Sequence, residues 1–256
     1  MIYFVGAGCG AVDLITVRGK DLLEKADIII YAGSLVNPQL LTYAKETCRI
    51  YNSAVMTLDE VLQVMVDGAE KVPCVVRLHT GDPSIYGAIR EQMHVLDEKG
   101  IPYECCPGVS AAFGAAAGLH LEYTLPEVSQ SLIITRMEGR TGVPQKESIE
   151  SFAAHGTSMA IYLSADRMEE LQKRLLAGGY PKDTPAAIVY KATWPEEEKY
   201  ICTLDALAET ADAHGIRNLA VVLVGNVISK SGYALSRLYS PDFETGFRKV
   251  RSESET

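Results

Sequence analysis

The sequence predicts an α/β protein with mainly parallel sheets, and three observations lead to that prediction. Short apolar runs rich in β-branched residues alternate with segments whose apolar residues recur at helical spacing. Glycine follows several helical segments, as at Gly68, Gly100 and Gly215, and is typical of a helix end. With 256 residues, of which 47% are hydrophobic and 22% charged, the chain can form one large or two smaller folded domains.

The elements follow from these patterns in chain order. We expect strands at residues 2–5, 27–31, 74–78, 132–135, 159–163, 187–190 and 220–224, and a further strand that contains Cys105 and Cys106. We expect helices at residues 20–26, 38–47, 58–68, 87–99, 111–118, 146–154, 166–176 and 204–213. Because neighbouring residues of a strand point to opposite faces, Cys105 and Cys106 are not expected to form a catalytic pair.

A polar connector with a proline, residues 119–126, follows the small-residue helix and indicates a domain boundary. We therefore predict an N-terminal α/β domain at 1–120, a C-terminal α/β domain at 130–240 and a tail at 241–256. The end of that tail is polar.

Charge and cysteine usage exclude several classes of protein. A formal net charge of -9 argues against nucleic acid or an anionic membrane as the main partner. The start of the chain lacks a signal-peptide pattern and no window has the roughly 18–20 apolar residues of a membrane span, so we expect a cytoplasmic protein. The six cysteines form no CxxC pair and the histidines share no ligand spacing, so no metal site is expected.

A glycine-rich turn at residues 6–11, Gly-Ala-Gly-Cys-Gly-Ala, follows the first strand and allows a close approach of backbone to a ligand. It fits a dinucleotide fingerprint, but a purely structural tight turn could use the same residues. The fingerprint also needs a helix that opens inside the motif and an acid after the second strand. Here Thr16 is the better helix cap, and the second strand runs into residues 31–34, Tyr-Ala-Gly-Ser.

Two more glycine-bearing turns follow strands, at residues 80–87 (Thr-Gly-Asp-Pro-Ser-Ile-Tyr-Gly) and 107–112 (Pro-Gly-Val-Ser-Ala-Ala). Ligands of open α/β sheets bind beyond the carboxyl ends of strands, so the three turns are expected to converge on one pocket. Asp82 and Ser110 could instead serve only as helix caps.

These turns occur in the order of a known family. Residues 5–10 (Val-Gly-Ala-Gly-Cys-Gly) with 13–16 (Asp-Leu-Ile-Thr), then 80–83 and 107–111, resemble the tetrapyrrole methylases, S-adenosylmethionine-dependent enzymes of corrin and sirohaem synthesis. The resemblance continues at 161–163, 184–189 and 224–227 and covers nearly the whole chain. Several spaced motifs in the correct order are more specific than one glycine turn.

Three longer segments are similar to the precorrin-4 C11-methyltransferases within that family. They are residues 31–36 (Tyr-Ala-Gly-Ser-Leu-Val), 79–87 and 129–136 (Ser-Gln-Ser-Leu-Ile-Ile-Thr-Arg). The resemblance implies C11 methylation of precorrin-4 or cobalt-precorrin-4 to the corresponding precorrin-5 in cobalamin biosynthesis. It also implies S-adenosyl-L-methionine held between two α/β domains, S-adenosyl-L-homocysteine as product, the macrocycle across the first domain, and a homodimer.

The resemblance also implies the site residues. Those expected at the cofactor are mostly small or apolar and comprise Cys9, Gly81, Asp82, Ile85, Ser110, Ala111, Leu163, Ala187 and Ala192. The family often has Pro and Asp at the positions of Cys9 and Ala11, so this chain departs from the family pattern at these two positions. Asp82 and His79 are the catalytic candidates, with His79 as a substrate contact or proton acceptor, or else a structural histidine.

The substrate candidates are Asp13, Ser34, Leu35, Arg136 and Arg140. An early corrinoid carries many carboxylates, which a chain of net charge -9 repels at long range, so a local cationic site is needed. Arg136 and Arg140 suit carboxylates through their bidentate forks, although a solvated loop with Glu138 as counter-charge is the alternative. Arg77 and Lys191 are the next candidates, and Trp194 is either a pocket wall or a packing residue.

Other functions stay open from the sequence alone. The first glycine turn is compatible with a nicotinamide-dependent oxidoreductase or with a non-catalytic nucleotide-binding domain. Within the resembled family, another tetrapyrrole C-methyltransferase is the alternative.

Overall fold

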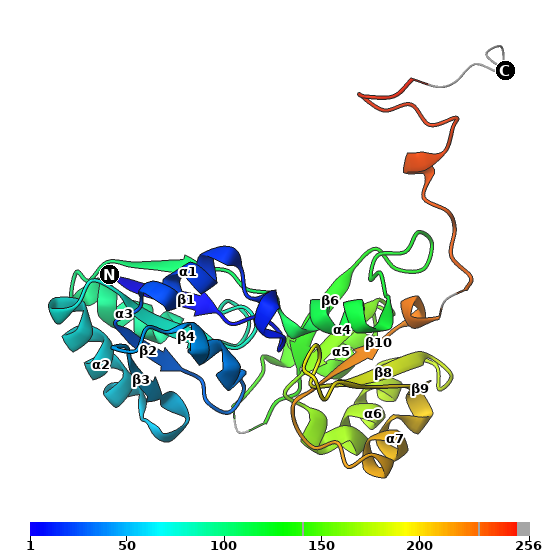
Figure 1. Ribbon diagram of the computed structural model, residues 1–256. Helices are drawn as coiled ribbons and strands as arrows, with labels where there is room; N and C mark the ends of the chain where they lie inside the picture. The colour runs from blue at the N-terminus through cyan, green and yellow to red at the C-terminus, as the bar shows by residue number, and fades with distance from the viewer. Residues whose placement is uncertain (140, 230, 250–256) are drawn as a thin grey trace. The chain divides into compact units, whose positions relative to one another are not determined.

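The computed structural model describes residues 1–139, 141–229 and 231–249, and its contacts divide the chain into two compact units (Figure 1). The first unit comprises Met1–His120, Ile188–Tyr200 and Gly215–Val221. The second comprises Leu121–Ala187, Ile201–His214 and Val222–Thr256. The first unit thus takes up two stretches from late in the chain.

The first sheet has five strands in the order β3-β2-β4-β1-β5, and every pair is parallel. Its strands are β1 (Ile2–Gly6), β2 (Ile28–Tyr31), β3 (Arg49–Asn52), β4 (Val75–His79) and β5 (Tyr103–Cys106). Gly6 lies opposite His79, and Val5 lies opposite Cys106. The carboxyl ends of β1, β4 and β5 therefore meet at one edge of the sheet.

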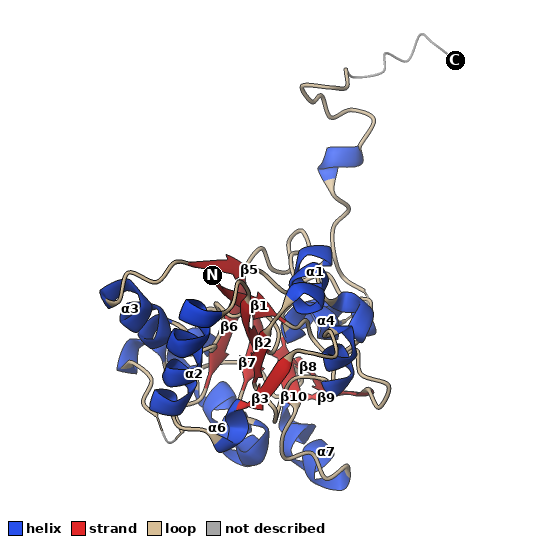
Figure 2. Ribbon diagram, turned by 60° about the vertical axis from the view of Figure 1, so that its left-hand side comes forward, coloured by secondary structure: helices blue, strands red, loops and turns tan. Residues whose placement is uncertain are grey.

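Helices cover both faces of this sheet, and Figure 2 shows α2 and α3 on one side of its strands and α1 on the other. The helices of this part are α1 (Val17–Lys25), α2 (Leu58–Lys71), α3 (Arg90–Glu98) and α4 (Ala111–Leu119). Alternation along β1 sends Phe4 into the core with Met65 of α2 and Leu96 of α3. Val5 points to the opposite core, which contains Leu23 of α1.

Helix starts in this unit follow local capping chemistry. The Thr16 side chain accepts a hydrogen bond from the N–H of Gly19 and caps α1, as the sequence predicts. At α2, Thr57 and Glu60 form a reciprocal capping box. The helix expected at residues 38–47 is instead the short 3₁₀ helix Pro38–Tyr43, whose start is capped by the Asn37 side chain.

The second sheet has the strand order β6-β7-β10-β8-β9. Its strands are β6 (Leu132–Arg136), β7 (Ser158–Tyr162), β8 (Pro185–Tyr190), β9 (Glu198–Thr203) and β10 (Ala220–Val224), and the accompanying helices are α5 (Ile149–Ala153), α6 (Met168–Ala177) and α7 (Leu207–Ala213). The pair β6–β7 is parallel, whereas β7–β10 is antiparallel. The predicted α/β class is confirmed, and parallel pairs predominate over the two sheets taken together.

Two strands, β3 and β9, were not expected from the sequence. Each lies at the end of its sheet, and several of its side chains are exposed, among them Ile50 and Ile201. An edge strand that is open to solvent has no continuous apolar run, so its signal is weak.

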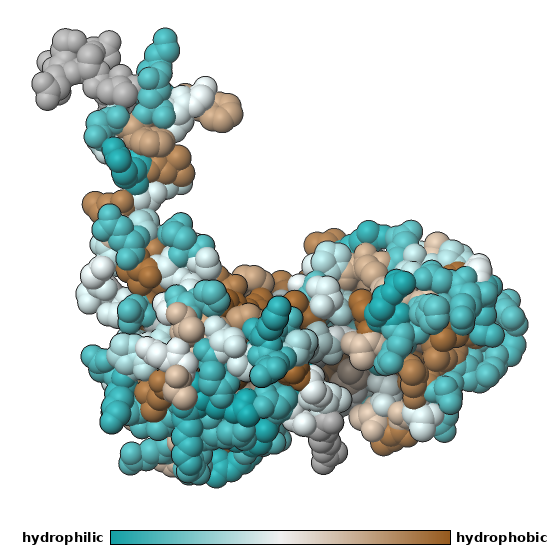
Figure 3. Space-filling view, turned by 180° about the vertical axis from the view of Figure 1, so that it is seen from behind, coloured by the Kyte–Doolittle hydropathy of each residue, from teal (hydrophilic) through white to brown (hydrophobic). Residues whose placement is uncertain are grey.

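On the face drawn in Figure 3, hydrophilic side chains cover most of the surface and hydrophobic side chains form smaller patches between them. Apolar side chains are exposed on the C-terminal segment, including Leu235, Tyr239 and Phe247. Within the described ranges, no helix has both the length and the apolar character needed to cross a membrane.

Candidate functional site

Backbone hydrogen bonds join the turns that follow β1 and β4. The N–H of Gly8 donates to the carbonyl of Gly81 at 3.2 Å, and the N–H of Gly81 donates to the carbonyl of Gly8 at 2.9 Å. The N–H of Ala7 donates to the carbonyl of His79 at 2.7 Å. The two turns are therefore held together by their main chains.

The turn after β5 packs against the other two at glycine. A Cβ on Gly6 would lie 2.6 Å from the Cα of Gly108, and a Cβ on Gly108 would lie 2.2 Å from the carbonyl oxygen of Gly81. Such distances exclude any side chain at Gly6 or Gly108. The predicted convergence of the three turns at one sheet edge is confirmed.

Asp82 links two of these turns through its carboxylate. It accepts hydrogen bonds from the N–H of Gly108 at 2.9 Å, the N–H of Ser84 at 2.8 Å and the Ser84 hydroxyl at 2.5 Å. Burial alone would raise the pKa of Asp82, but the hydrogen bonds from the Ser84 hydroxyl and the two N–H groups outweigh it and lower that pKa. Asp82 is thus an ionised side chain that fixes the turn, and α3 begins only at Arg90.

The third turn leads into α4 through small residues. Ser110 occupies the N-cap position, but its side chain makes no capping hydrogen bond there. A Cβ on Gly81, whose φ is +59°, would lie 3.5 Å from the Cα of Ser110 and 3.9 Å from the nitrogen of Ala111. At this corner the site offers main chain and methyl groups, which suits a ligand recognised by backbone and apolar contacts.

A fourth segment, from late in the chain, reaches the first turn. The Thr193 hydroxyl accepts a hydrogen bond from the N–H of Ala11 at 3.0 Å and donates one to the Cys9 sulfur at 3.3 Å. The half-buried Trp194 ring packs on Gly10, where a Cβ would lie 2.1 Å from that ring and 2.7 Å from the Ala192 carbonyl oxygen. Ala192 is therefore beside the first glycine turn, and Trp194 packs against that turn.

The segment after β2 also reaches these turns. The Asn37 amide donates to the carbonyl of Gly10 at 2.9 Å, and the Thr80 hydroxyl donates to the carbonyl of Leu35 at 3.3 Å. Leu35 is 38% exposed. The substrate candidate Leu35 thus lies at the second turn, whereas Asp13 lies in the short 3₁₀ helix Val12–Leu14 that follows the first.

Buried polar groups extend from β4 beneath the site. Arg77 donates to the Gln92 amide oxygen at 3.3 Å and to the Ile30 carbonyl at 3.2 Å, and burial lowers its pKa to about 10. His79 stacks on Phe4 with 6.1 Å between ring centroids. Burial and then the charge of Arg77 lower the pKa of His79 to about 3, so its ring is neutral at pH 7.

Nothing among the described residues hydrogen-bonds the buried Nε2 of His79. An imidazole with so low a pKa is a weak base, which does not favour His79 as a proton acceptor. That role stays a prediction.

Two cofactor candidates belong to the second unit. Leu163 follows β7 with φ +51° and is 59% exposed, while Ala187 is fully buried in β8. A non-glycine residue at positive φ is costly, by about 1–3 kcal/mol, and such residues cluster at functional sites. The backbone of Leu163 therefore supports a functional role at this position.

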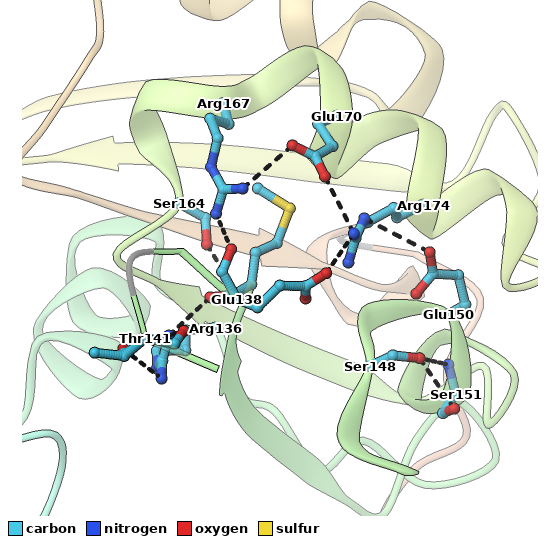
Figure 4. A network of polar contacts seen from close by, with 11 residues as sticks. Arg136, Glu138, Thr141, Ser148, Glu150, Ser151, Ser164, Arg167, Glu170 and Arg174 are labelled. Carbon is cyan, nitrogen blue, oxygen red and sulfur yellow. Dashed lines mark hydrogen bonds and ion pairs between the residues drawn. The ribbon is translucent and has the colours of Figure 1, made fainter. Parts of the chain in front are cut away.

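The loop after β6 is ordered by its own arginine, as Figure 4 shows. Arg136 donates to the carbonyls of Met137, Thr141 and Gly142 and to the Thr141 hydroxyl, at 2.9–3.3 Å. These bonds use four of its five N–H groups, which leaves little capacity for a bidentate carboxylate. Arg140 lies outside the described residues.

Glu138, the acidic residue of this loop, was expected in the alternative interpretation to serve as a counter-charge within the loop, but it pairs with a residue outside it. Glu138 pairs with Arg174, which also contacts Glu150 and Glu170, and Arg167 donates to the Glu138 carbonyl (Figure 4). The hydrogen bond that Arg174 donates, and to a lesser extent its charge, lowers the pKa of Glu138. The network joins the loop to α5 and α6 within the second unit.

Sequence reasoning missed two residues of the site, Asn37 and Thr193. Asn37 had a usable signal, because an asparagine before a proline is typical of a helix cap. Thr193 had none, because its partners Cys9 and Ala11 lie 184 and 182 positions away in the chain.

Comparison with known proteins places the chain in a family. Residues 1–208 match the sequence profile of the Tetrapyrrole (Corrin/Porphyrin) Methylases. The cobalt-precorrin-4 C(11)-methyltransferase of Methanocaldococcus jannaschii is 50% identical over 97% of this chain and 96% of its own length. The precorrin-4 C(11)-methyltransferase of Pseudomonas aeruginosa is 40% identical over 96% of this chain and 98% of its own length.

Solved structures agree with the sequence relatives. An X-ray structure of a cobalt precorrin-4 methyltransferase, a cobalamin biosynthetic enzyme, matches with a TM-score of 0.87 and 41% identity over 89% of this chain and 95% of its own. The uroporphyrin-III C-methyltransferase of Thermus thermophilus, solved with S-adenosyl homocysteine, matches with a TM-score of 0.76 and 26% identity. The match covers 89% of this chain and 98% of the other. The chain therefore belongs to the tetrapyrrole (corrin/porphyrin) methylases.

Proposed function

We propose that the protein transfers the methyl group of S-adenosylmethionine to C11 of precorrin-4 or cobalt-precorrin-4, and so forms the corresponding precorrin-5 in cobalamin biosynthesis. The convergence of three glycine turns at the carboxyl edge of the first sheet is the observation that supports this function best. The relatives with 40–50% identity have this activity in their names.

The residues present fit such a cofactor. Gly81, Ala111 and Ala192 are small residues at or beside the glycine turns, and Asp82 supplies an ionised carboxylate for a cationic ligand. Cys9, Ile85 and Ser110 of the first unit and Leu163 and Ala187 of the second complete the proposed set. When bound, the cofactor supplies an electrophilic methyl group.

The protein's own contribution is orientation. Alignment of the nucleophilic carbon with the methyl group and sulfur in a site that excludes water can supply about 7–11 kcal/mol. Asp82 fixes the second turn against the third, so the surface that meets the cofactor is organised before binding. Asp82 and His79 remain the side chains proposed to act nearest the reacting atoms.

The substrate is proposed to meet Asp13, Ser34 and Leu35 near the first two turns, with Arg136 and Arg140 for its carboxylates. Leu35 is supported by its contact with Thr80. Arg136 is supported by its positive charge alone. Its N–H groups already donate to carbonyls of its own loop. We also propose a cytoplasmic homodimer with domains at 1–120 and 130–240 and a tail at 241–256, and no nucleic-acid partner.

Calorimetric titration with S-adenosylhomocysteine, NADH and ATP tests the cofactor. We expect saturable binding of S-adenosylhomocysteine alone. Tight binding of NADH without binding of S-adenosylhomocysteine would overturn the proposal in favour of an oxidoreductase.

Incubation with methyl-labelled S-adenosylmethionine and precorrin-4 or its cobalt complex tests the reaction. We expect one label per macrocycle, located at C11 by carbon NMR. Label at another ring carbon would indicate a different C-methyltransferase of the same family.

A further inference from the structure

Thr193 has a backbone conformation that a β-branched residue rarely adopts. Its φ is +68°, and Lys191, two positions earlier, has a φ of +45°. A β-branched side chain at positive φ persists only where surrounding contacts hold it there. The conformation therefore points to a function for the contacts that Thr193 makes.

Those contacts reach three parts of the first unit. The hydroxyl bridges the N–H of Ala11 and the sulfur of Cys9. The N–H of Thr193 donates to the Glu197 carboxylate at 2.6 Å. A Cβ on Gly114 of α4 would lie 3.0 Å from the Thr193 methyl carbon and 2.7 Å from the Cys9 sulfur.

The carboxylate that holds the Thr193 backbone is itself fixed. Glu197 pairs with Lys199 at 3.0 Å, and Lys199 donates to the carbonyl of Gly118 near the end of α4 at 3.1 Å. The side chain of Glu197 is only 17% exposed. Thr193 is thus anchored to α4 and from there holds the first glycine turn.

We propose that Thr193 is a positioning residue for the cofactor, which acts by fixing the main chain of the first glycine turn through its hydroxyl. The proposal rests on the function proposed above. The turn has glycine at positions 6, 8 and 10, with φ of +81° at Gly8, and such a segment has many conformations to lose. The Thr193 hydroxyl accepts a hydrogen bond from Ala11 and donates one to Cys9, and so it fixes a single conformation of the turn before the cofactor binds.

The test compares Thr193→Val with Thr193→Ser. Valine has the same shape and the same backbone strain but no hydroxyl, whereas serine retains the hydroxyl. We expect Thr193→Val to weaken binding of S-adenosylhomocysteine about tenfold and to raise the KM for S-adenosylmethionine equally, with the KM for the tetrapyrrole unchanged. Thr193→Ser should bind within about twofold of the wild-type protein.

Thr193→Gly separates hydroxyl loss from backbone strain, because glycine adopts this φ without strain. We expect it to bind S-adenosylhomocysteine at least as weakly as Thr193→Val while remaining folded. Thr42→Val is the matched control, since the exposed Thr42 hydroxyl donates only to the nearby carbonyl of Gln39. It should bind like the wild-type protein.

Wild-type affinity in Thr193→Val or Thr193→Gly, or weak binding in Thr193→Ser, would overturn the positioning role. A wild-type protein that binds no S-adenosylhomocysteine would instead overturn the proposed function. The two failures are therefore distinguishable in one set of titrations.

Discussion

The carboxylate of Asp82 accepts a hydrogen bond from the N–H of Gly108, 26 positions later in the chain, at 2.9 Å. This single contact joins the turn after β4 to the turn after β5 across β1, which lies between them in the sheet. Because Asp82 also accepts two bonds from Ser84, its position is determined on both sides.

Replacement of Asp82 by asparagine should lower the stability of the protein by about 1–3 kcal/mol, because hydrogen bonds to a charged acceptor are lost. The folded-state pKa of Asp82 is lowered, so its stabilisation is present above the unfolded pKa and is lost as pH falls through the folded value. Denaturant unfolding of both proteins between pH 3 and pH 7 measures the difference in stability and its dependence on pH.

The Asp82→Asn protein should lose less stability than the wild type on acidification below about pH 4. Asp183→Asn, in an exposed loop, is the control and should follow the wild-type curve. Parallel curves for Asp82→Asn and the wild type would contradict the assignment.

Ala111→Leu should reduce the affinity for S-adenosylhomocysteine at least tenfold, because the larger side chain would extend from the start of α4, near Gly81, where the cofactor is proposed to bind. Ala117 lies on the same helix and is exposed, so Ala117→Leu is a matched control with the same chemical change. Calorimetric titration compares the two. Equal affinities would show that the cofactor does not bind at the start of α4.

His79→Phe should make the protein less sensitive to acid. Burial keeps the pKa of His79 at about 3, below the ordinary value of 6.5, so the unfolded state binds more protons between these values. Stability therefore falls as pH decreases from about 6.5, by about 2 kcal/mol between pH 7 and pH 5.

Thermal and denaturant unfolding of His79→Phe should show a smaller loss of stability over that pH range, while exposed His155→Phe should behave like the wild type. The same variant tests catalysis, since a proton acceptor at His79 requires a large fall in kcat. An unchanged kcat would assign His79 to the core alone.

Replacement of Arg136 and Arg140 by glutamine should raise the KM for the macrocycle and flatten its dependence on ionic strength, with S-adenosylhomocysteine affinity unchanged. The double variant Lys99→Gln with Lys182→Gln, both at exposed positions, removes the same net charge and is the control. Should KM rise by the same factor at every salt concentration, Arg136 acts by ordering its loop through Thr141 and Gly142.

Most of the fold was predictable because its signals are local. The runs that form β1, β2 and β10 are apolar and continuous, and Thr16 caps α1 through a bond within one turn. The edge strands β3 and β9 were missed because their exposed side chains interrupt the apolar pattern.

The site was predictable to the extent that its residues follow strands. The family resemblance read from the three turns is confirmed by the match over residues 1–208. Convergence at Gly6, Gly81 and Gly108 followed from parallel topology, whereas the contacts of Thr193 depend on tertiary structure that no local pattern encodes. The hydrogen bonds of Arg136 within its own loop could not be predicted either, because they depend on the loop conformation.

The composition of the first unit from three separate stretches has a consequence for synthesis on the ribosome. Residues 1–120 emerge first, but residues 188–200 and 215–221 of the same unit follow much later. At about 5–20 residues per second, the bond from Ala11 to Thr193 waits roughly 10–40 seconds for its acceptor to be translated. During elongation the first turn of the nascent chain therefore lacks its bond to Thr193, and this unit completes its folding only after residues 215–221 have been translated.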